Sequence, residues 1–272
     1  MATPHQELER FSLAARHALV TGASRGIGAA IAVALASAGA DVALLARSAD
    51  RLESVAGTIS ATSQRAVVLP CDVCDATSVA QAAGAAWQEL GAIDILVNAA
   101  GGPLFQAPIA AVREDGWNRV IALNLTSVLL LCQQVAPRMA ERRHGSIINL
   151  ASALPTRAWP AIAAYSAAKA GLLSLTQAMA VEWGQAGVRV NALCPGWIRT
   201  SLNQPYLEHD ATANTAIEPV PLARWGEVDD ITGTAIWLAS DAARYVSGAL
   251  IPIDGGLAVG MPQDWLEAMR LG

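Results

Sequence analysis

The chain has 272 residues, of which 53% are hydrophobic and 15% are charged, and its formal net charge is −5. This length fits one large α/β domain and requires no second one. No basic run is longer than Arg142-Arg143-His144, so nucleic acid and anionic membranes are poor partners for this acidic chain.

The first ten residues lack the basic and apolar regions of a signal peptide. The longest apolar stretch, 29–46, is broken by Gly39 and Asp41, so we interpret it as a helix followed by a strand and not as a membrane span. The cysteines indicate a reducing compartment without structural disulfides, and hence a cytoplasmic protein. They are Cys71, Cys74, Cys132 and Cys194. Because Cys71-x-x-Cys74 has no second pair and no histidine cluster, we expect no metal and no redox site there.

Apolar runs of strand length alternate with longer helical patterns along the chain. Candidate strands occupy 17–21, 41–46, 65–69, 93–97, 146–150, 188–193 and 250–253. Because these runs are continuously apolar and helices separate them, they predict an α/β fold whose parallel sheet is covered on both faces. Residues 198–222 break the pattern with three prolines and predict an irregular insert, placed where open α/β sheets bind ligands. An ordinary surface loop is the alternative.

A glycine-rich turn joins the first strand to the first helical pattern, with the sequence Gly22-Ala-Ser24-Arg25-Gly26-Ile27-Gly28. In this context the glycines let the backbone approach a pyrophosphate, and the helix N-terminus supplies amide donors. The turn therefore predicts a dinucleotide-binding site, although such turns alone give many false matches.

Tyr165 and Lys169 stand four residues apart in an Ala-rich run, so on a helix they share one face. An ammonium beside a phenol lowers the phenol pKa, which is otherwise about 10. A tyrosine tuned in this way can donate or accept a proton near neutral pH. Ser152 precedes Tyr165 by thirteen residues. Considered alone, Tyr165 and Lys169 could be an accidental surface pair.

Four further segments complete the pattern: Cys71-Asp72-Val73, Asn98-Ala99-Ala100-Gly101, Asn124 and Pro195-Gly196. With the glycine-rich turn and Ser152, Tyr165 and Lys169, they resemble the motifs of the short-chain dehydrogenase/reductase family, in order and spacing, from Thr21 to Gly256. The resemblance implies an oxidoreductase and a homotetramer. It also implies a single Rossmann-type domain over 1–272, with a doubly wound, seven-stranded parallel sheet and helices on both faces. Residues 1–14 would be an N-terminal extension and about 198–222 a substrate lid, while the tail 257–272 would either pack on a neighbouring subunit or fray.

The resemblance implies a role for each of four catalytic residues. Tyr165 is expected to be the general acid in carbonyl reduction and the general base in alcohol oxidation, with Lys169 lowering its pKa and bonding the nicotinamide ribose. Ser152 is expected to hydrogen-bond the substrate oxygen. Asn124 is expected to hold a water that links Lys169 to solvent; a helix-interior amide that bonds its own backbone is the alternative.

Cofactor and substrate contacts follow from the same resemblance. The expected cofactor-binding residues are Gly22, Ser24, Arg25, Gly26, Ile27, Gly28, Arg47, Asp72, Val73, Asn98, Ala99, Gly101, Tyr165, Lys169, Pro195, Gly196, Ile198 and Thr200. The expected substrate contacts are Ala153, Leu154, Trp159, Trp197 and Leu202. For Trp159, plain core packing is an equal alternative.

The end of the second strand bears on the choice of cofactor. Enzymes that prefer NAD usually place an Asp or Glu there, which bonds the ribose hydroxyls and repels a 2′-phosphate. This chain has Ala46 and then Arg47, and Arg25 of the glycine-rich turn could reach the same phosphate. Two guanidiniums and no carboxylate favour NADP(H) over NAD(H). Solvated surface arginines are the alternative.

The substrate is less determined by the sequence. The segments 200–205 and 221–227 are similar to those of gluconate 5-dehydrogenase-like members, which interconvert sugar acids and keto acids. Trp159 stands where a polar or cationic contact to a carboxylate is expected, and it suits an apolar or aromatic ketone better. Both substrate classes therefore stay open.

Two other functions compete with this interpretation. A 3-oxoacyl-carrier-protein reductase has an equally similar pattern, but an acidic carrier requires a basic patch near the cleft. Arg142 and Arg143 would supply one half of that patch, whereas Gln185-Ala186 supplies no second cation. A non-catalytic dinucleotide-sensing regulator is disfavoured because all four catalytic positions are occupied. The expected partners are therefore a small carbonyl or alcohol substrate and further copies of the chain.

Overall fold

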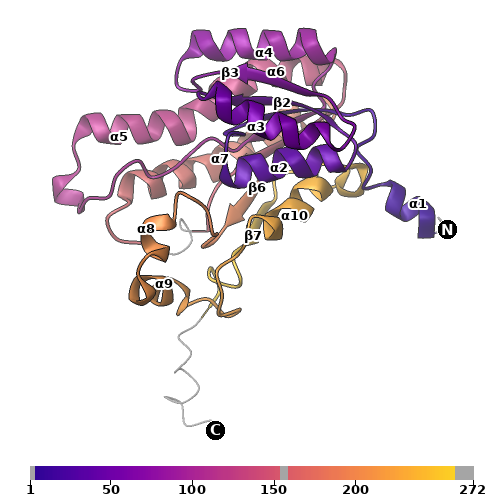
Figure 1. The fold of residues 1–272 in the computed structure, drawn as a ribbon. Helices are drawn as coiled ribbons and strands as arrows, with labels where there is room; N and C mark the ends of the chain where they lie inside the picture. The colour runs from indigo at the N-terminus through magenta and orange to yellow at the C-terminus, as the bar shows by residue number, and fades with distance from the viewer. Residues whose placement is uncertain (1–3, 154–158, 261–272) are drawn as a thin grey trace.

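The computed structural model describes residues 4–153 and 159–260 (Figure 1). Its seven strands form one sheet in the order β3-β2-β1-β4-β5-β6-β7, and every neighbouring pair is parallel. The strands are β1 (His17–Thr21), β2 (Asp41–Ala46), β3 (Ala66–Pro70), β4 (Ile95–Asn98), β5 (Gly145–Leu150), β6 (Val188–Pro195) and β7 (Leu250–Ile253). The predicted seven-stranded parallel sheet is confirmed, with strand bounds that differ by at most two residues.

The order of the strands reverses next to β1, which pairs with β2 on one side and with β4 on the other. Thr21 at the end of β1 is level with Asn98 at the end of β4. Open α/β sheets bind their ligands at such a reversal, beyond the carboxyl ends of the strands. The topology alone therefore points to the edge of the sheet that carries Thr21 and Asn98.

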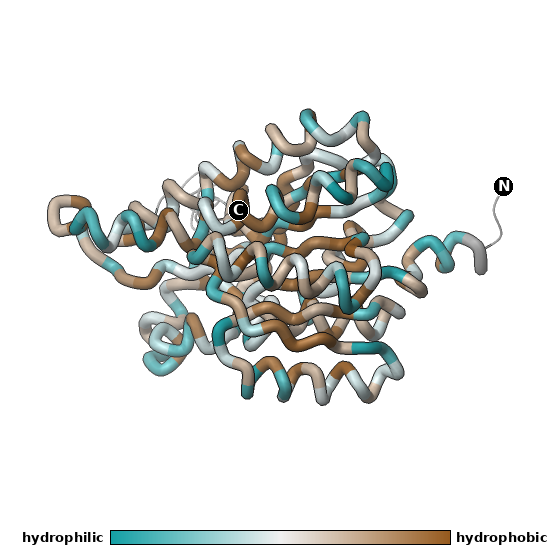
Figure 2. Tube along the Cα trace, turned by 90° about the horizontal axis from the view of Figure 1, so that it is seen from above, coloured by the Kyte–Doolittle hydropathy of each residue, from teal (hydrophilic) through white to brown (hydrophobic). Residues whose placement is uncertain are grey.

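Helices cover both faces of the sheet, and each face has its own hydrophobic core. One core includes buried residues of α2 (Gly26–Ser37), α3 (Ala49–Ser60) and α10 (Asp229–Ala239). The other includes buried residues of α4 (Ala76–Leu90), α6 (Ser127–Glu141) and α7 (Ala163–Gly184). Figure 2 shows the strands as the most hydrophobic part of the chain, running through its middle. The continuously apolar runs of the sequence are explained by this burial on both faces.

A single helical run precedes β5. It consists of α5 (Glu114–Ile121), a π-helical segment (Ala122–Thr126) and α6. In the part of the chain that the structure describes, residues 114–141 are the one helix long and apolar enough, by length and composition, to cross a membrane. However, Leu131 and Val135 of α6 are fully buried in the core beside the sheet. The π-helical segment is a local widening that often occurs at functional sites.

The segment predicted as an irregular insert, 198–222, contains two short helices, α8 (Gln204–Leu207) and α9 (Asp210–Ile217). Figure 1 shows them together beside the carboxyl end of β6. The prediction of irregular structure was wrong here, because these helices are too short to show a periodic apolar pattern. They are stabilised by packing on two tryptophans, Trp197 and Trp225. At the other end of the chain, α1 (Pro4–Glu9) projects away from the sheet (Figure 1).

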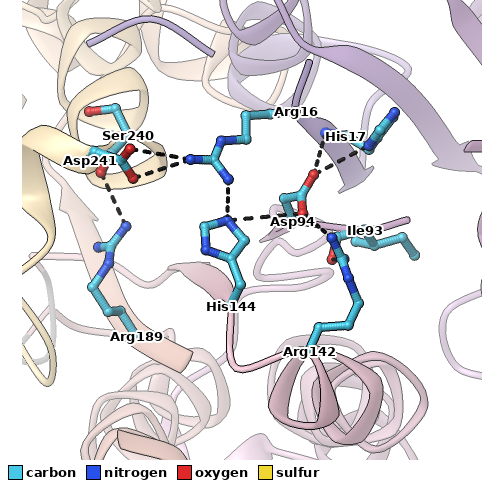
Figure 3. A network of polar contacts seen from close by, with 9 residues as sticks. All are labelled: Arg16, His17, Ile93, Asp94, Arg142, His144, Arg189, Ser240 and Asp241. Carbon is cyan, nitrogen blue, oxygen red and sulfur yellow. Dashed lines mark hydrogen bonds and ion pairs between the residues drawn. The ribbon is translucent and has the colours of Figure 1, made fainter. Parts of the chain in front are cut away.

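A network of charged side chains lies at the opposite, amino edge of the sheet (Figure 3). Asp94, whose side chain is 4% exposed, accepts hydrogen bonds from the backbone N–H of His17 (3.0 Å) and from Arg142 (2.9 Å). Burial raises the pKa of Asp94, but these two contacts outweigh burial and hold the pKa below 3.8. Burial and the nearby Arg16 lower the pKa of His144, which contacts Arg16. This network joins β1, β4 and β5 at the edge away from Thr21 and Asn98.

Candidate active site

The glycine-rich turn lies between β1 and α2 and has a conformation that requires glycine. Gly22 has φ +67°, and a Cβ built on it would lie 2.8 Å from the backbone N of Ala100. A Cβ on Gly28 would lie 2.4 Å from the backbone O of Gly22. The chain can therefore turn tightly and place the N-terminus of α2 at the carboxyl edge of the sheet. Its free N–H groups and dipole at that place fit a bound pyrophosphate.

Thr21 connects this turn to the segment that follows β4. Its Oγ1 accepts hydrogen bonds from the backbone N–H groups of Ala99 (3.0 Å) and Ala100 (3.1 Å). The sequence analysis quoted Thr21 as part of a motif but assigned it no role. The signal was a polar side chain at the end of an otherwise apolar strand, beside the strand reversal.

Ser152, Tyr165 and Lys169 meet beyond the carboxyl end of β5. Lys169, which is 3% exposed, donates a hydrogen bond from Nζ to the backbone O of Leu150 (2.7 Å). Its Nζ lies 5.7 Å from the centroid of the Tyr165 ring. Ser152 lies two residues after the end of β5, is 4% exposed, and is hydrogen-bonded to Tyr165. The first turns of α7 thus bring the phenol and the ammonium to the serine, as their spacing predicts.

The pKa values of these residues differ from the expectation. Burial raises the pKa of Tyr165 to about 12, and the hydrogen bond with Ser152 offsets only part of that increase. Burial likewise lowers the pKa of Lys169 to about 8. The net pKa of the phenol is therefore raised and not lowered, because desolvation outweighs the hydrogen bond with Ser152. The phenol is protonated at neutral pH, as an acid for carbonyl reduction must be.

Asn124 lies in the π-helical segment and is fully buried. Its amide donates to the backbone O of Gly102 (2.9 Å) and of Val120 (2.9 Å), and its Oδ1 accepts from the N–H of Gly102 (2.9 Å). A Cβ on Gly101 would lie 2.8 Å from the Asn124 Oδ1 and 3.2 Å from the Lys169 Nζ. Asn124 therefore positions the Gly101-Gly102 segment behind Lys169, and the water that it is expected to hold stays a prediction.

The residues expected to contact the adenosine part of the cofactor differ in burial and in hydrogen bonding. Arg25 and Arg47 are exposed and form no ion pair within the described part of the chain. Asp72 is exposed and accepts a hydrogen bond from the N–H of Cys74 (3.0 Å), whereas Val73 is buried. The side chain of Asn98 is also buried and donates to Asn149 (2.9 Å) inside the sheet. Its contribution to the cleft is therefore limited to its backbone.

A cavity of about 530 Å³ opens beside Ser152, Tyr165 and Lys169. The predicted residues that line it are Ile27, Ala99, Gly101, Ser152, Trp159, Tyr165, Lys169, Pro195, Gly196, Trp197, Ile198, Thr200 and Leu202. Lining residues that the sequence analysis missed include Gln106, Ile162, Asn203, Tyr206 and Thr212. Asn203, Tyr206 and Thr212 lie within 198–222, which was predicted as a lid without naming them. Gln106 comes from a loop and Ile162 from the start of α7, and no sequence signal marked these two.

Two predicted substrate contacts have a different outcome. Ala153 is 2% exposed and is not among the residues that line the cavity. It follows Ser152 at the end of β5, and its N–H donates to the backbone O of Pro195 (2.9 Å), which directs its side chain into the interior. Leu154 lies outside the described residues.

Within 4–153 and 159–260, no three His, Cys, Asp or Glu side chains are grouped so that they could hold a metal ion. The four cysteines are free thiols; Cys74 is exposed and the other three are buried.

Comparisons with known proteins define the class to which this protein belongs. Residues 22–258 match the family model described as enoyl-(acyl carrier protein) reductase. The chain belongs to the short-chain dehydrogenase/reductase family and is an oxidoreductase.

Three relatives show how far the similarity extends. Gluconate 5-dehydrogenase of Gluconobacter oxydans is 36% identical over 92% of this chain and 98% of its own length. D-threitol dehydrogenase of Mycolicibacterium smegmatis is 40% identical over 92% of this chain and 95% of its own. The crystal structure of a gluconate 5-dehydrogenase from Burkholderia cenocepacia, in complex with NADP and tartrate, has a TM-score of 0.89 and 37% identity, covering 93% of this chain and 99% of that one.

Proposed function

We propose that this protein is an NADP(H)-dependent oxidoreductase that interconverts a ketone and a secondary alcohol, with Tyr165 as general acid and base. One observation carries the proposal. Ser152, Tyr165 and Lys169 line a single cavity, and Ile27 of the glycine-rich turn lines the same cavity. The nicotinamide, when bound, supplies or accepts the hydride.

The residues of this chain would bind the carbonyl oxygen of the substrate and transfer a proton to it. In reduction, Ser152 and Tyr165 would both donate hydrogen bonds to the carbonyl oxygen, stabilising the negative charge that develops there. The Tyr165 phenol, with a pKa of about 12, would then give its proton to that oxygen. Lys169, with a pKa of about 8, is still mostly protonated at neutral pH, so its ammonium would stabilise the phenolate that results.

The preference for NADP(H) is part of the proposal. It is supported by the exposed guanidiniums of Arg25 and Arg47, which form no ion pair with any described residue, and by Ala46 at the end of β2, where no carboxylate stands. A guanidinium and a phosphate form a charge-assisted, forked pair. NADP is also the cofactor in the Burkholderia complex described above.

The alternative 3-oxoacyl-carrier-protein reductase is less well supported by the charges. Arg142 is engaged by the buried Asp94, and Arg143 donates to the backbone O of Gln185 (3.1 Å). Arg142 is therefore neutralised, and both arginines lie at the amino edge of the sheet, away from the cavity near which the docking argument requires a basic patch.

The remaining parts of the proposal concern the protein as a whole. We place it in the cytoplasm, which its free cysteines support. We also propose a single domain over 1–272, a homotetramer, and a lid formed by about 198–222. Size measurement of the purified protein in solution would test the tetramer.

A Tyr165→Phe variant tests the reaction mechanism. We expect kcat to fall by at least about a hundredfold, because general acid–base catalysis supplies that much or more. The Kd for NADPH should stay within a few-fold of the wild-type value. The measurement is nicotinamide absorbance with a panel of ketones and alcohols, and near-wild-type turnover by the Phe variant would refute the assignment.

A further inference from the structure

Four aromatic side chains form one wall of the active-site cavity, and we call them the Trp197 wall. The Trp197 ring stands at the centre. Its centroid lies 5.2 Å from that of Trp159, 5.5 Å from that of Tyr206 and 5.4 Å from that of Trp225. Trp159, Trp197 and Tyr206 line the cavity, while Trp225 supports them from behind. Aromatic faces of this kind offer a large apolar contact area to a ligand.

Backbone and side-chain hydrogen bonds hold the wall in place. The Trp197 backbone O accepts from the N–H of Gly226 (2.8 Å), and the N–H of Arg199 donates to the O of Gly226 (2.8 Å). The Trp225 indole donates to the backbone O of Ala213 in α9 (3.2 Å). The Trp197 indole N–H is buried and has no hydrogen-bond partner among the described residues. The wall is therefore a preformed apolar surface.

The charges near this wall are already paired. Arg199 forms an ion pair with Glu227 (3.2 Å), and Arg224 forms one with Asp230 (2.7 Å). Of the described residues that line the cavity, Lys169 alone carries a charge at neutral pH. In the mechanism proposed above, Lys169 serves the phenol and the cofactor. A substrate carboxylate on this wall would therefore be desolvated without a cationic partner among the described residues, which is strongly unfavourable.

The polar side chains of the lining are also partly engaged. The Gln106 amide donates to the Tyr206 hydroxyl, and the Asn203 amide donates to the backbone O of Ile198 (2.8 Å). Leu202 adds an apolar side chain from the lid and lies close to Gly102, where an added Cβ would be 3.5 Å from its Cδ1. The cavity thus presents apolar faces around the reacting groups.

We propose that the substrate is an uncharged ketone or alcohol whose apolar or aromatic body packs on the Trp197 wall, and that sugar acids are rejected. This inference rests on the proposed oxidoreductase function. Specificity would come from two effects. The apolar body gains contact with the rings, and a carboxylate loses its hydration without gaining a cation.

The test compares three cyclohexanones that differ at one substituent: 4-methylcyclohexanone, 4-oxocyclohexanecarboxamide and 4-oxocyclohexanecarboxylate. The amide and the carboxylate have nearly the same shape, so their ratio isolates the charge. We expect kcat/KM for the amide to exceed that for the carboxylate by at least about thirtyfold, which corresponds to about 2 kcal/mol. The methyl compound should be at least as good a substrate as the amide.

Leu202 allows a gain-of-function variant, because it is 48% exposed and its replacement should not prevent folding. Leu202→Arg should lower the ratio of kcat/KM for the amide to kcat/KM for the carboxylate at least about tenfold relative to the matched, uncharged Leu202→Gln, since a cation then faces the carboxylate. Arg157, which lies outside the described residues, is replaced by Ala in a further variant and should leave the ratio unchanged.

Two results would overturn the inference and leave the proposed oxidoreductase function in place. One is equal or faster turnover of the carboxylate by the wild type, including faster oxidation of D-gluconate than of the uncharged D-threitol. The other is turnover of the carboxylate by the wild type that is lost in the Arg157→Ala variant. If none of these five compounds reacts with NADP(H) or NAD(H), both the inference and the proposed function are wrong.

Discussion

Lys169 is the single lysine of the chain, and its replacement by methionine should stabilise the protein while it abolishes catalysis. Burial lowers its pKa from 10.5 to about 8, and each pKa unit corresponds to about 1.4 kcal/mol. The charged form therefore costs the folded state about 3 kcal/mol at neutral pH. Lys169→Met removes this cost but also loses the hydrogen bond to the backbone O of Leu150, which offsets about 1 kcal/mol of the gain. We expect Lys169→Met to gain about 2 kcal/mol, or about 4 °C or more in Tm.

The pH dependence of this gain distinguishes burial of the charge from improved packing. The folded-state pKa is the lower one, so between about pH 8 and pH 10.5 the unfolded chain keeps a proton that the folded chain has lost. Wild-type stability therefore rises by about 3 kcal/mol through this window relative to the variant, so the advantage of the variant disappears and reverses at high pH. Urea denaturation of both proteins at about pH 7 and about pH 10 measures this change in the stability difference.

A matched control removes a cation from the surface. Arg51 is exposed on α3, and Arg51→Met should change the free energy of unfolding by less than about 0.5 kcal/mol. If Lys169→Met is less stable than the wild type at neutral pH, the ammonium gains more from its contacts than burial costs. The reasoning would then be refuted.

Two further predictions concern charges at the two edges of the sheet. Replacing Ala46 by Asp and Arg47 by Ile should invert the cofactor preference, since one guanidinium–phosphate pair contributes about 2 kcal/mol, or about thirtyfold. The measurement is kcat/KM for NADPH and NADH with one ketone, and a wild type that prefers NADH would contradict the role of Arg47. Asp94→Asn should lower the free energy of unfolding by about 2 kcal/mol at neutral pH, because Arg142 loses a buried partner. Since the Asp94 pKa is lowered, this deficit should vanish as the pH falls below about 4; an unchanged urea midpoint at neutral pH would contradict it.

The sheet could be predicted from the sequence because its residues obey a simple rule. Strands such as Asp41–Ala46 are buried on both faces, so they are continuously apolar and stand out between longer helical patterns. The same rule fails at 198–222. There α8 and α9 owe their conformation to contacts with Trp197 and Trp225, and a segment of four or eight residues has too few positions to reveal a period.

The candidate site could be predicted in part for a similar reason. Spacing along a helix is a local property, so the approach of Tyr165 to Lys169 followed from their separation of four residues. Their pKa values depend on how much of the rest of the chain covers them. Both are buried, and desolvation raises one pKa and lowers the other. The expectation from charge alone therefore had the wrong direction for the phenol.

The two edges of the sheet show why the role of a charged residue cannot be predicted from the sequence alone: it depends on the partners that the fold provides. The sequence analysis treated Arg142 and Arg143 as half of a docking patch, yet Arg142 binds the buried Asp94 at the amino edge (Figure 3). At the carboxyl edge, Arg25 and Arg47 are exposed, and no described carboxylate pairs with them. A cation that is already neutralised within the fold contributes to stability, and its binding to a ligand would require breaking that pair. An unpaired cation beside an anion-binding helix N-terminus has no such cost, and it is therefore the one that can select a phosphate.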